Sequence, residues 1–190
     1  KIVMMNTEKR KFLTFSDSYH GKTLGALSIT DAENYNDNFL IGLPRENILT
    51  AEFNSIESVI KIINENSDIA AMILEPIQGQ KINVGEKDFI EKLIKVCKEN
   101  EIITIFDEIK VGMGRTGYLF SFMEYDVEPD ILTISKSLGG GSRAIGAMVT
   151  TNNLFKKAYG SRTTAALHST TFGGIGTTCE VAIESLKIIS

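Results

Sequence analysis

The chain has 190 residues, of which 43% are hydrophobic and 23% charged, with 16 Gly, 3 Pro and 2 Cys, and these proportions exclude a disordered, collagen-like or disulfide-rich protein. The formal net charge of -4 leaves no basic excess for phosphate backbones, so no nucleic-acid partner is expected. No apolar run approaches the roughly 20 residues of a membrane helix, and residues 1–11 lack the apolar core of a signal peptide. The two cysteines lie far apart in the sequence, which suits a reducing compartment. We therefore expect a cytoplasmic protein without a membrane partner.

Short apolar runs, each followed by a polar or turn residue, predict the buried strands of a mostly parallel sheet. In chain order they are residues 12–15 as a candidate fifth strand, 69–74, 102–106, 131–135 and 145–149. Apolar residues spaced by three and four predict helices over residues 56–63 and 89–97. The alternation of strands and helices predicts an α/β fold with an open, mostly parallel sheet flanked by helices.

Two further segments carry local signals. The polar stretch at residues 31–38 predicts a loop. Residues 177–189 predict a helix with Val181, Ala182, Ser185, Leu186 and Ile189 on one side. Its first residues, Thr177 and Glu180, have the spacing of a capping box.

Charged side chains follow three of the predicted strands, where ligands of such sheets collect. Glu75 follows residues 69–74, Asp107 and Glu108 follow residues 102–106, and Lys136 follows residues 131–135. A lysine partly desolvated at a strand end can attack a carbonyl carbon and form a Schiff base. A neighbouring aspartate can keep a heterocyclic nitrogen protonated, which is the partner that pyridoxal phosphate requires.

Each of these residues also has a plainer interpretation. Lys136 could be a solvated loop residue, and Asp107 could cap a helix. The glycines at 139–141 could form a flexible turn or allow backbone to approach a ligand. His20 and His168 are isolated and the cysteines lack Cys-x-x-Cys spacing, so no metal site is expected.

Taken together, several blocks resemble the signature of the class III pyridoxal-phosphate aminotransferases. They are FDEI at 106–109, GMGRTG at 112–117, EPDI at 128–131 and SKSLGGG at 135–141, with YHGKTLGALS at 19–28, ILEPIQG at 73–79 and HSTTFGG at 168–174 in agreement. Within that family the sequences of these blocks are most similar to those of acetylornithine, ornithine and putrescine (diamine) aminotransferases. The likeness extends from one end of the chain to the other.

The resemblance implies the large cofactor-binding domain of fold-type I enzymes and pyridoxal 5'-phosphate as cofactor. Lys136 would form the Schiff base with the cofactor and then move a proton, and Asp107 would pair with the pyridinium nitrogen. The implied reaction transfers an amino group from an amine or ω-amino acid, such as a diamine or an ornithine-like donor, to a 2-oxo acid.

The same resemblance assigns residues around the cofactor. Tyr19 would stack on one face of the ring with His20 beside it, Ile109 would pack on the other face, and Glu75 would help to organise the site. Thr170 and Thr171 would reach the cofactor phosphate of a neighbouring subunit. We therefore expect a homodimer with shared active sites.

Three of the residues assigned to the site depart from the pattern of the family. Lys110 replaces a Gln near the phenolic oxygen of the cofactor, and because racemase-like relatives carry Lys there, a racemase or aminomutase is the alternative function. Lys22 replaces an Arg that clamps a substrate carboxylate, and a lysine offers only a point charge. Gln80 replaces a Glu that gates two substrates. A non-catalytic domain that retains the fold is the remaining alternative.

The resemblance covers the central part of longer family members. Neither the upstream phosphate-binding segment nor the C-terminal small domain of the family is recognisable in the sequence. We therefore expect residues 1–190 to form a single cofactor-binding large domain, to lack activity alone and to bind the cofactor weakly.

Overall fold

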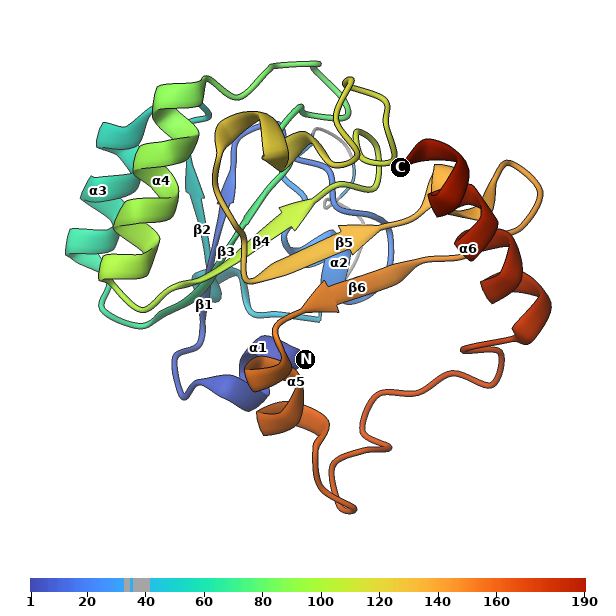
Figure 1. The fold of residues 1–190 in the computed structure, drawn as a ribbon. Coiled ribbons are helices and arrows are strands. Elements are labelled where there is room, and N and C mark those ends of the chain that lie inside the picture. Colours follow the sequence, from blue (N-terminus) through green and yellow to red (C-terminus); the bar gives the residue numbers. More distant parts are fainter. Residues whose placement is uncertain (33–34, 36–41) are drawn as a thin grey trace.

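The computed structural model describes residues 1–32, 35 and 42–190. A single sheet of six strands runs through its centre in the order β2-β1-β3-β4-β5-β6, and all neighbours are parallel except β5 and β6 (Figure 1). The strands are β1 (Lys11–Phe15), β2 (Ile48–Ala51), β3 (Ile69–Leu74), β4 (Ile103–Asp107), β5 (Ile131–Ile134) and β6 (Ala147–Thr150).

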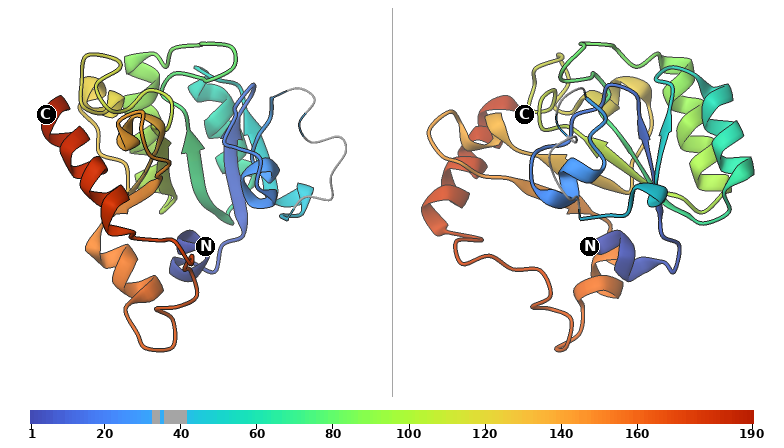
Figure 2. Two further views of the ribbon diagram at one scale, coloured as in Figure 1. Left: turned by 90° about the vertical axis from the view of Figure 1, so that its right-hand side faces the viewer. Right: turned by 180° about the vertical axis from the view of Figure 1, so that it is seen from behind.

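Helices cover both faces of this sheet. They are α1 (Ile2–Asn6), α2 (Leu24–Ser28), α3 (Ile56–Glu65), α4 (Lys87–Glu99), α5 (Asn152–Tyr159) and α6 (Gly176–Ile189), with 3-10 turns η1 (Arg45–Asn47), η2 (Ser121–Tyr125) and η3 (Lys136–Gly139). The apolar sides of α3, α4 and α6 share one buried cluster with the sheet, while α1 and α5 belong to a second cluster. Figure 2 shows α3 and α4 side by side and α1 beside α5, apart from them. The predicted α/β architecture is confirmed.

The predicted strands are all present, with small shifts at their ends. The run at residues 69–74 forms β3 without any shift, and every residue of β3 is buried because it lies in the middle of the sheet. The prediction at residues 145–149 is displaced, since β6 spans Ala147–Thr150. The edge strand β2 was not predicted, because only Ala51 of its four residues is buried and the strand has no continuous apolar run.

The predicted helices are confirmed, but one cap is wrong. Ser55 caps α3 by accepting a hydrogen bond from the Ser58 amide. In α6 the helix already begins at Gly176, so Thr177 lies inside the first turn and no side chain caps the helix. The short helices α1, α2 and α5 were not predicted, and the predicted loop at residues 31–38 lies partly outside the described residues. In the part of the chain that the structure describes, no helix is long and apolar enough to cross a membrane.

The strand order fixes where a ligand can bind. From β1 the chain goes to one side of the sheet to form β2, and then crosses back to form β3 on the other side of β1. The loops after β1 and β3 therefore leave the sheet in opposite directions and open a crevice at their carboxyl ends. The polar strand-end residues predicted from the sequence meet at this edge.

Candidate active site

A cavity of about 260 Å³ lies at the carboxyl ends of β1, β3, β4 and β5. It is lined by Tyr19, His20, Gly21, Glu75, Gly79, Gln80, Asp107, Ile109, Lys110 and Lys136. All the predicted site residues except Lys22, Thr170 and Thr171 are thus brought together from loops far apart in the sequence.

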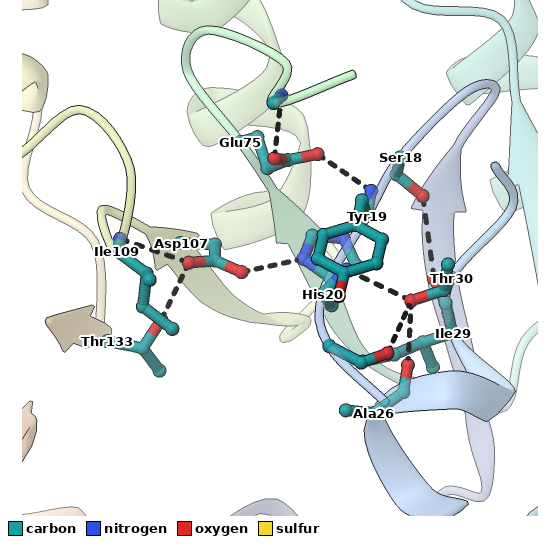
Figure 3. Close-up of polar contacts among 12 residues, drawn as sticks. Ser18, Tyr19, His20, Ala26, Ile29, Thr30, Glu75, Asp107, Ile109 and Thr133 are labelled. Atoms are coloured by element: carbon teal, nitrogen blue, oxygen red, sulfur yellow. Dashed lines mark hydrogen bonds and ion pairs between the residues drawn. The ribbon is translucent and has the colours of Figure 1, made fainter. Parts of the chain in front are cut away.

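A buried polar contact of the cavity joins Asp107 to His20. Asp107 is the last residue of β4, and its Oδ2 lies 2.9 Å from Nδ1 of His20, with the two side chains only 7% and 2% exposed (Figure 3). The other oxygen, Oδ1, accepts hydrogen bonds from the Ile109 amide at 3.1 Å and the Thr133 hydroxyl at 3.3 Å. Hydrogen bonds therefore fix both oxygens of the carboxylate. The alternative interpretation of Asp107 as a helix cap is wrong, because a turn and not a helix follows Asp107.

The loop after β1 holds His20 from its other side. The His20 amide donates to the Thr30 hydroxyl at 3.0 Å, and that hydroxyl donates to the Ala26 carbonyl at 3.0 Å. The Nε2 atom of His20 is buried and has no hydrogen-bond partner among the described residues. A buried polar atom without a partner is uncommon and often marks a functional position.

Glu75 ties two loops of the cavity together. Its Oε2 accepts from the Tyr19 amide at 2.8 Å and its Oε1 from the Gly79 amide at 2.9 Å. Burial raises the pKa of Glu75 above its ordinary value, while the two amides and the neighbouring His20 oppose that rise. The carboxyl group thus fixes the backbone at Tyr19.

Glu108, the second acid after β4, does not face the cavity. It is 1% exposed and accepts hydrogen bonds from the Ser121 amide, the Ser121 hydroxyl and the Phe122 amide. These contacts hold η2 against the end of β4, and burial raises the pKa of Glu108. Its role is to fix the loop that carries Ile109.

Two lysines line the cavity in different surroundings. The Lys110 amine donates to the Gly79 carbonyl at 2.5 Å and is half-buried. Lys136 is exposed, so the expectation that its amine is partly desolvated is wrong for this chain. Lys136 is the first residue of the turn η3 and not part of the buried strand β5.

Three predicted residues lie outside the cavity. Lys22 is exposed, and its amine lies 5.3 Å from the centre of the Tyr35 ring, which in turn packs against Tyr19 at 5.1 Å. Thr170 and Thr171 are exposed on the segment between α5 and α6, which extends away from the sheet (Figure 2).

The sequence interpretation missed two glycines and one threonine of the site. A Cβ at Gly79 would lie 2.9 Å from Oε1 of Glu75, so a larger residue there would displace the carboxyl group that accepts from the Gly79 amide. Gly21 has a φ of +119, a value that favours glycine. Both glycines lie within a few residues of polar residues that follow a strand, and this position in the sequence could have indicated them. No local sequence pattern indicates Thr133.

Comparison with known proteins identifies the family. The family model described as aminotransferase class-III matches residues 1–190. The chain belongs to the class III aminotransferases. Among curated members, the acetylornithine aminotransferase of Methanocaldococcus jannaschii is 37% identical over 188 residues, covering 98% of this chain and 44% of that enzyme. The acetylornithine/succinyldiaminopimelate aminotransferase of Buchnera aphidicola is 39% identical over 186 residues, covering 97% and 43%.

Solved aminotransferase structures agree with this fold. The ornithine aminotransferase of Toxoplasma gondii, described with pyridoxal phosphate at partial occupancy in its active site, matches with a TM-score of 0.85 at 27% identity, over 95% of this chain and 41% of that one. An (S)-enantioselective ω-transaminase from Thermomicrobium roseum matches with a TM-score of 0.88 at 27% identity, over 98% and 45%. The predicted likeness to fold-type I enzymes is confirmed, and the chain spans less than half the length of these relatives.

Proposed function

We propose that the protein containing this chain is a pyridoxal-phosphate-dependent aminotransferase that moves an amino group from an amine or ω-amino acid to a 2-oxo acid. The observation that carries the proposal is the convergence of Tyr19, Asp107 and Lys136 on one cavity. An aromatic ring, a fixed carboxylate and an accessible primary amine are the groups that such a cofactor needs.

The residues of the cavity fit this cofactor. A carboxylate offers about four acceptor positions, and three protein groups contact the two oxygens of Asp107, which leaves room for one ring N–H. When bound, pyridoxal phosphate supplies an aldehyde that condenses with amines and a protonated ring nitrogen that withdraws electrons. Asp107 would hold the proton on that nitrogen, and Lys136 would anchor the aldehyde carbon and carry a proton to and from it.

The walls of the cavity would orient a flat ring. Tyr19 and Ile109 come from the loops after β1 and β4, and they would pack on its two faces with His20 beside Tyr19. Glu75 fixes the Tyr19 backbone through the hydrogen bond described above. The two ring-packing side chains are therefore supported by polar contacts within the protein.

The substrate class rests on the relatives and on two exposed residues. The relatives act, by their names, on acetylornithine, succinyldiaminopimelate and ornithine, which are donors with an amino group far from a carboxylate. Gln80 lies at the cavity and Lys22 lies beyond Tyr35. We assign both to the binding of the far end of the donor, where Lys22 would attract a carboxylate as a point charge.

A racemase or aminomutase is the second candidate, and the position of Lys110 favours it. Its amine lies in the same cavity as Lys136 and could serve as a second acid or base. The two functions differ in their co-substrate. An aminotransferase forms product only with an oxo acid such as pyruvate or oxoglutarate present, whereas a racemase needs no acceptor.

The proposal also covers the oligomeric state of the protein, its cellular location and the domain that residues 1–190 form. The exposure of Thr170 and Thr171, away from the cavity of their own chain, supports a homodimer in which they complete the partner's site. The free cysteines Cys97 and Cys179 support a reducing, cytoplasmic location. Residues 1–190 would form the central cofactor-binding domain, and purified alone they should show no turnover and bind pyridoxal phosphate weakly.

Covalent trapping tests the proposal. The intact protein is titrated with pyridoxal phosphate, reduced with borohydride and mapped by mass spectrometry. We expect the label on Lys136, and its loss in Lys136→Ala but not in Lys95→Ala, which removes an exposed lysine of α4. Label scattered over surface lysines would contradict the proposal. A Lys136→Ala variant that keeps the function of the protein would also contradict it, and this is the outcome expected of a non-catalytic domain.

A further inference from the structure

The backbone that carries Lys136 is unusual. Its φ is +50, in the left-handed region that residues with a Cβ rarely adopt, and Gly140 and Gly141 follow with φ of +57 and +71. Such a conformation persists only where the surroundings fix it. The contacts of η3 therefore decide where the Lys136 amine lies.

Three contacts anchor the two ends of this turn. The Ser135 hydroxyl donates to the Ile145 carbonyl at 2.7 Å, and Leu138 is buried. Gly140 lies so close to α6 that a Cβ there would be 2.7 Å from the Ser185 hydroxyl. None of these contacts joins the turn to the loop after β4, which forms the neighbouring wall of the cavity.

Arg115 makes that connection. Its Nη1 donates to the Lys110 carbonyl and its Nη2 to the Ser137 hydroxyl, each at 2.5 Å. Within the described part of the chain, no other side-chain hydrogen bond links residues 136–142 to the loop after β4. One guanidinium thus holds the residue next to Lys136 and the backbone of the other cavity lysine.

The choice of arginine follows from this geometry. A guanidinium presents several donors in a rigid plane, so that two acceptors on different loops can be held at a fixed separation. A lysine has a single nitrogen on a flexible stem and cannot reproduce this fork. Arginine and lysine are therefore not equivalent at position 115, although both carry a positive charge.

We propose that Arg115 is a positioning residue that fixes the turn bearing Lys136 against the loop bearing Lys110. It keeps the two amines in a constant relation across the cavity without touching either amine. The importance of Lys136 rests on the proposed function. The two hydrogen bonds of the Arg115 guanidinium, which we call the clamp, are a property of the chain and can be measured without cofactor or substrate.

Hydrogen exchange in the cofactor-free intact protein tests the clamp. In Arg115→Lys we expect the backbone amides of residues 136–142 to exchange about tenfold faster, since a hydrogen bond from a charged donor contributes enough to shift a local opening equilibrium by that factor. Ser137→Ala removes only the acceptor and should have a similar effect. The matched control is Arg143→Lys, because among the described residues the guanidinium of exposed Arg143 donates a hydrogen bond only to the carbonyl of its neighbour Ser142. Its backbone amide bond to Gly139 is kept in the variant, so the exchange of residues 136–142 should stay unchanged.

Trapping provides the second readout. After addition of pyridoxal phosphate, borohydride labelling of Lys136 should slow about tenfold in Arg115→Lys and Ser137→Ala. The double variant should be no slower than Arg115→Lys, because Ser137→Ala removes only the Arg115–Ser137 contact, which Arg115→Lys already breaks. Unchanged exchange and unchanged labelling in both single variants would overturn the role of Arg115. Absence of Lys136 labelling in the unmodified protein would instead refute the proposed function, and the exchange experiment would still decide the clamp.

Discussion

The Nδ1 atom of His20 lies 2.9 Å from Oδ2 of Asp107, and this contact joins the loop after β1 to the end of β4 across 87 positions of sequence. Because both side chains are almost fully buried, neither can find water as a substitute partner. The pair therefore supports the fold of the cavity and the orientation of the carboxylate together.

Removal of the imidazole should affect both properties. In His20→Ala we expect a loss of about 1–3 kcal/mol of stability, the usual cost of leaving a buried polar group without its partner. Affinity for pyridoxal phosphate should fall about tenfold through the less fixed carboxylate. His20→Asn, whose amide can donate to Asp107, should recover part of both. Denaturant unfolding and cofactor titration measure the effects, with His168→Ala as the control, and equal behaviour of all three variants would contradict this account.

The buried acid Glu108 gives stability a pH dependence of defined sign. Its pKa is raised in the folded protein above the ordinary value of 4.5, chiefly by burial. The folded state therefore holds the proton more tightly than the unfolded state, and the resulting stability is present below pH 4.5 and is lost as pH rises through the folded pKa.

Glu108→Gln isolates this contribution, since glutamine does not titrate. The variant should be less stable by about 1–3 kcal/mol at pH 4.5, because its amide group would face the backbone donors of Ser121 and Phe122. Its deficit relative to the unmodified protein should narrow as pH rises to 7. A deficit that stays constant or widens in urea titrations across this range would exclude a raised pKa.

Two adjacent glycines offer a matched test of the packing of α6. Gly140→Ala would place a Cβ 2.7 Å from the Ser185 hydroxyl, whereas Gly141→Ala meets nothing within 4 Å, and both positions have positive φ. Both variants should lose about 1–2 kcal/mol from the left-handed backbone, and Gly140→Ala should lose about 1–3 kcal/mol more from overpacking. If denaturant unfolding showed equal losses of stability for the two variants, α6 would be able to move away from the added Cβ without a loss of stability.

The two cysteines should differ in reactivity. Burial raises the pKa of Cys97 to about 12, so at pH 8 its thiol is protonated and inaccessible. Cys179 is only half-buried on α6. Iodoacetamide at pH 8 should therefore modify Cys179 in the folded protein and Cys97 only after unfolding, as mapped by mass spectrometry. Cys179→Ser should abolish the fast modification, and rapid labelling of Cys97 would contradict its burial.

Much of the fold could be predicted because its strands are bounded by charged residues. Asp68 and Glu75 flank the apolar run of β3, so both of its ends were predictable. The four-residue strand β2 has no such run, because an edge strand needs fewer buried side chains. The order of the strands follows from packing between distant segments, which local periodicity does not contain.

For the site, residue types were predictable and contacts were not. Strand-end positions indicated Glu75, Asp107 and Lys136, and all three line the cavity. The contact of His20 with Asp107 could not be predicted, because it depends on the placement of β1 two strands away from β4. Lys136 is exposed and begins the turn η3, and the apolar run before it specifies neither property.

The strand order also has a consequence for how the protein acquires its site. The cavity takes its walls from residues 19 to 136, through the loops that follow four different strands. Contacts between such distant segments form late during folding, because each requires a long loop to close. A chain in which these four strands have not yet paired therefore has no cavity, and a ligand that binds there stabilises only molecules in which β1, β3, β4 and β5 are in place. Cofactor binding would thus report that these four strands of the central sheet have assembled.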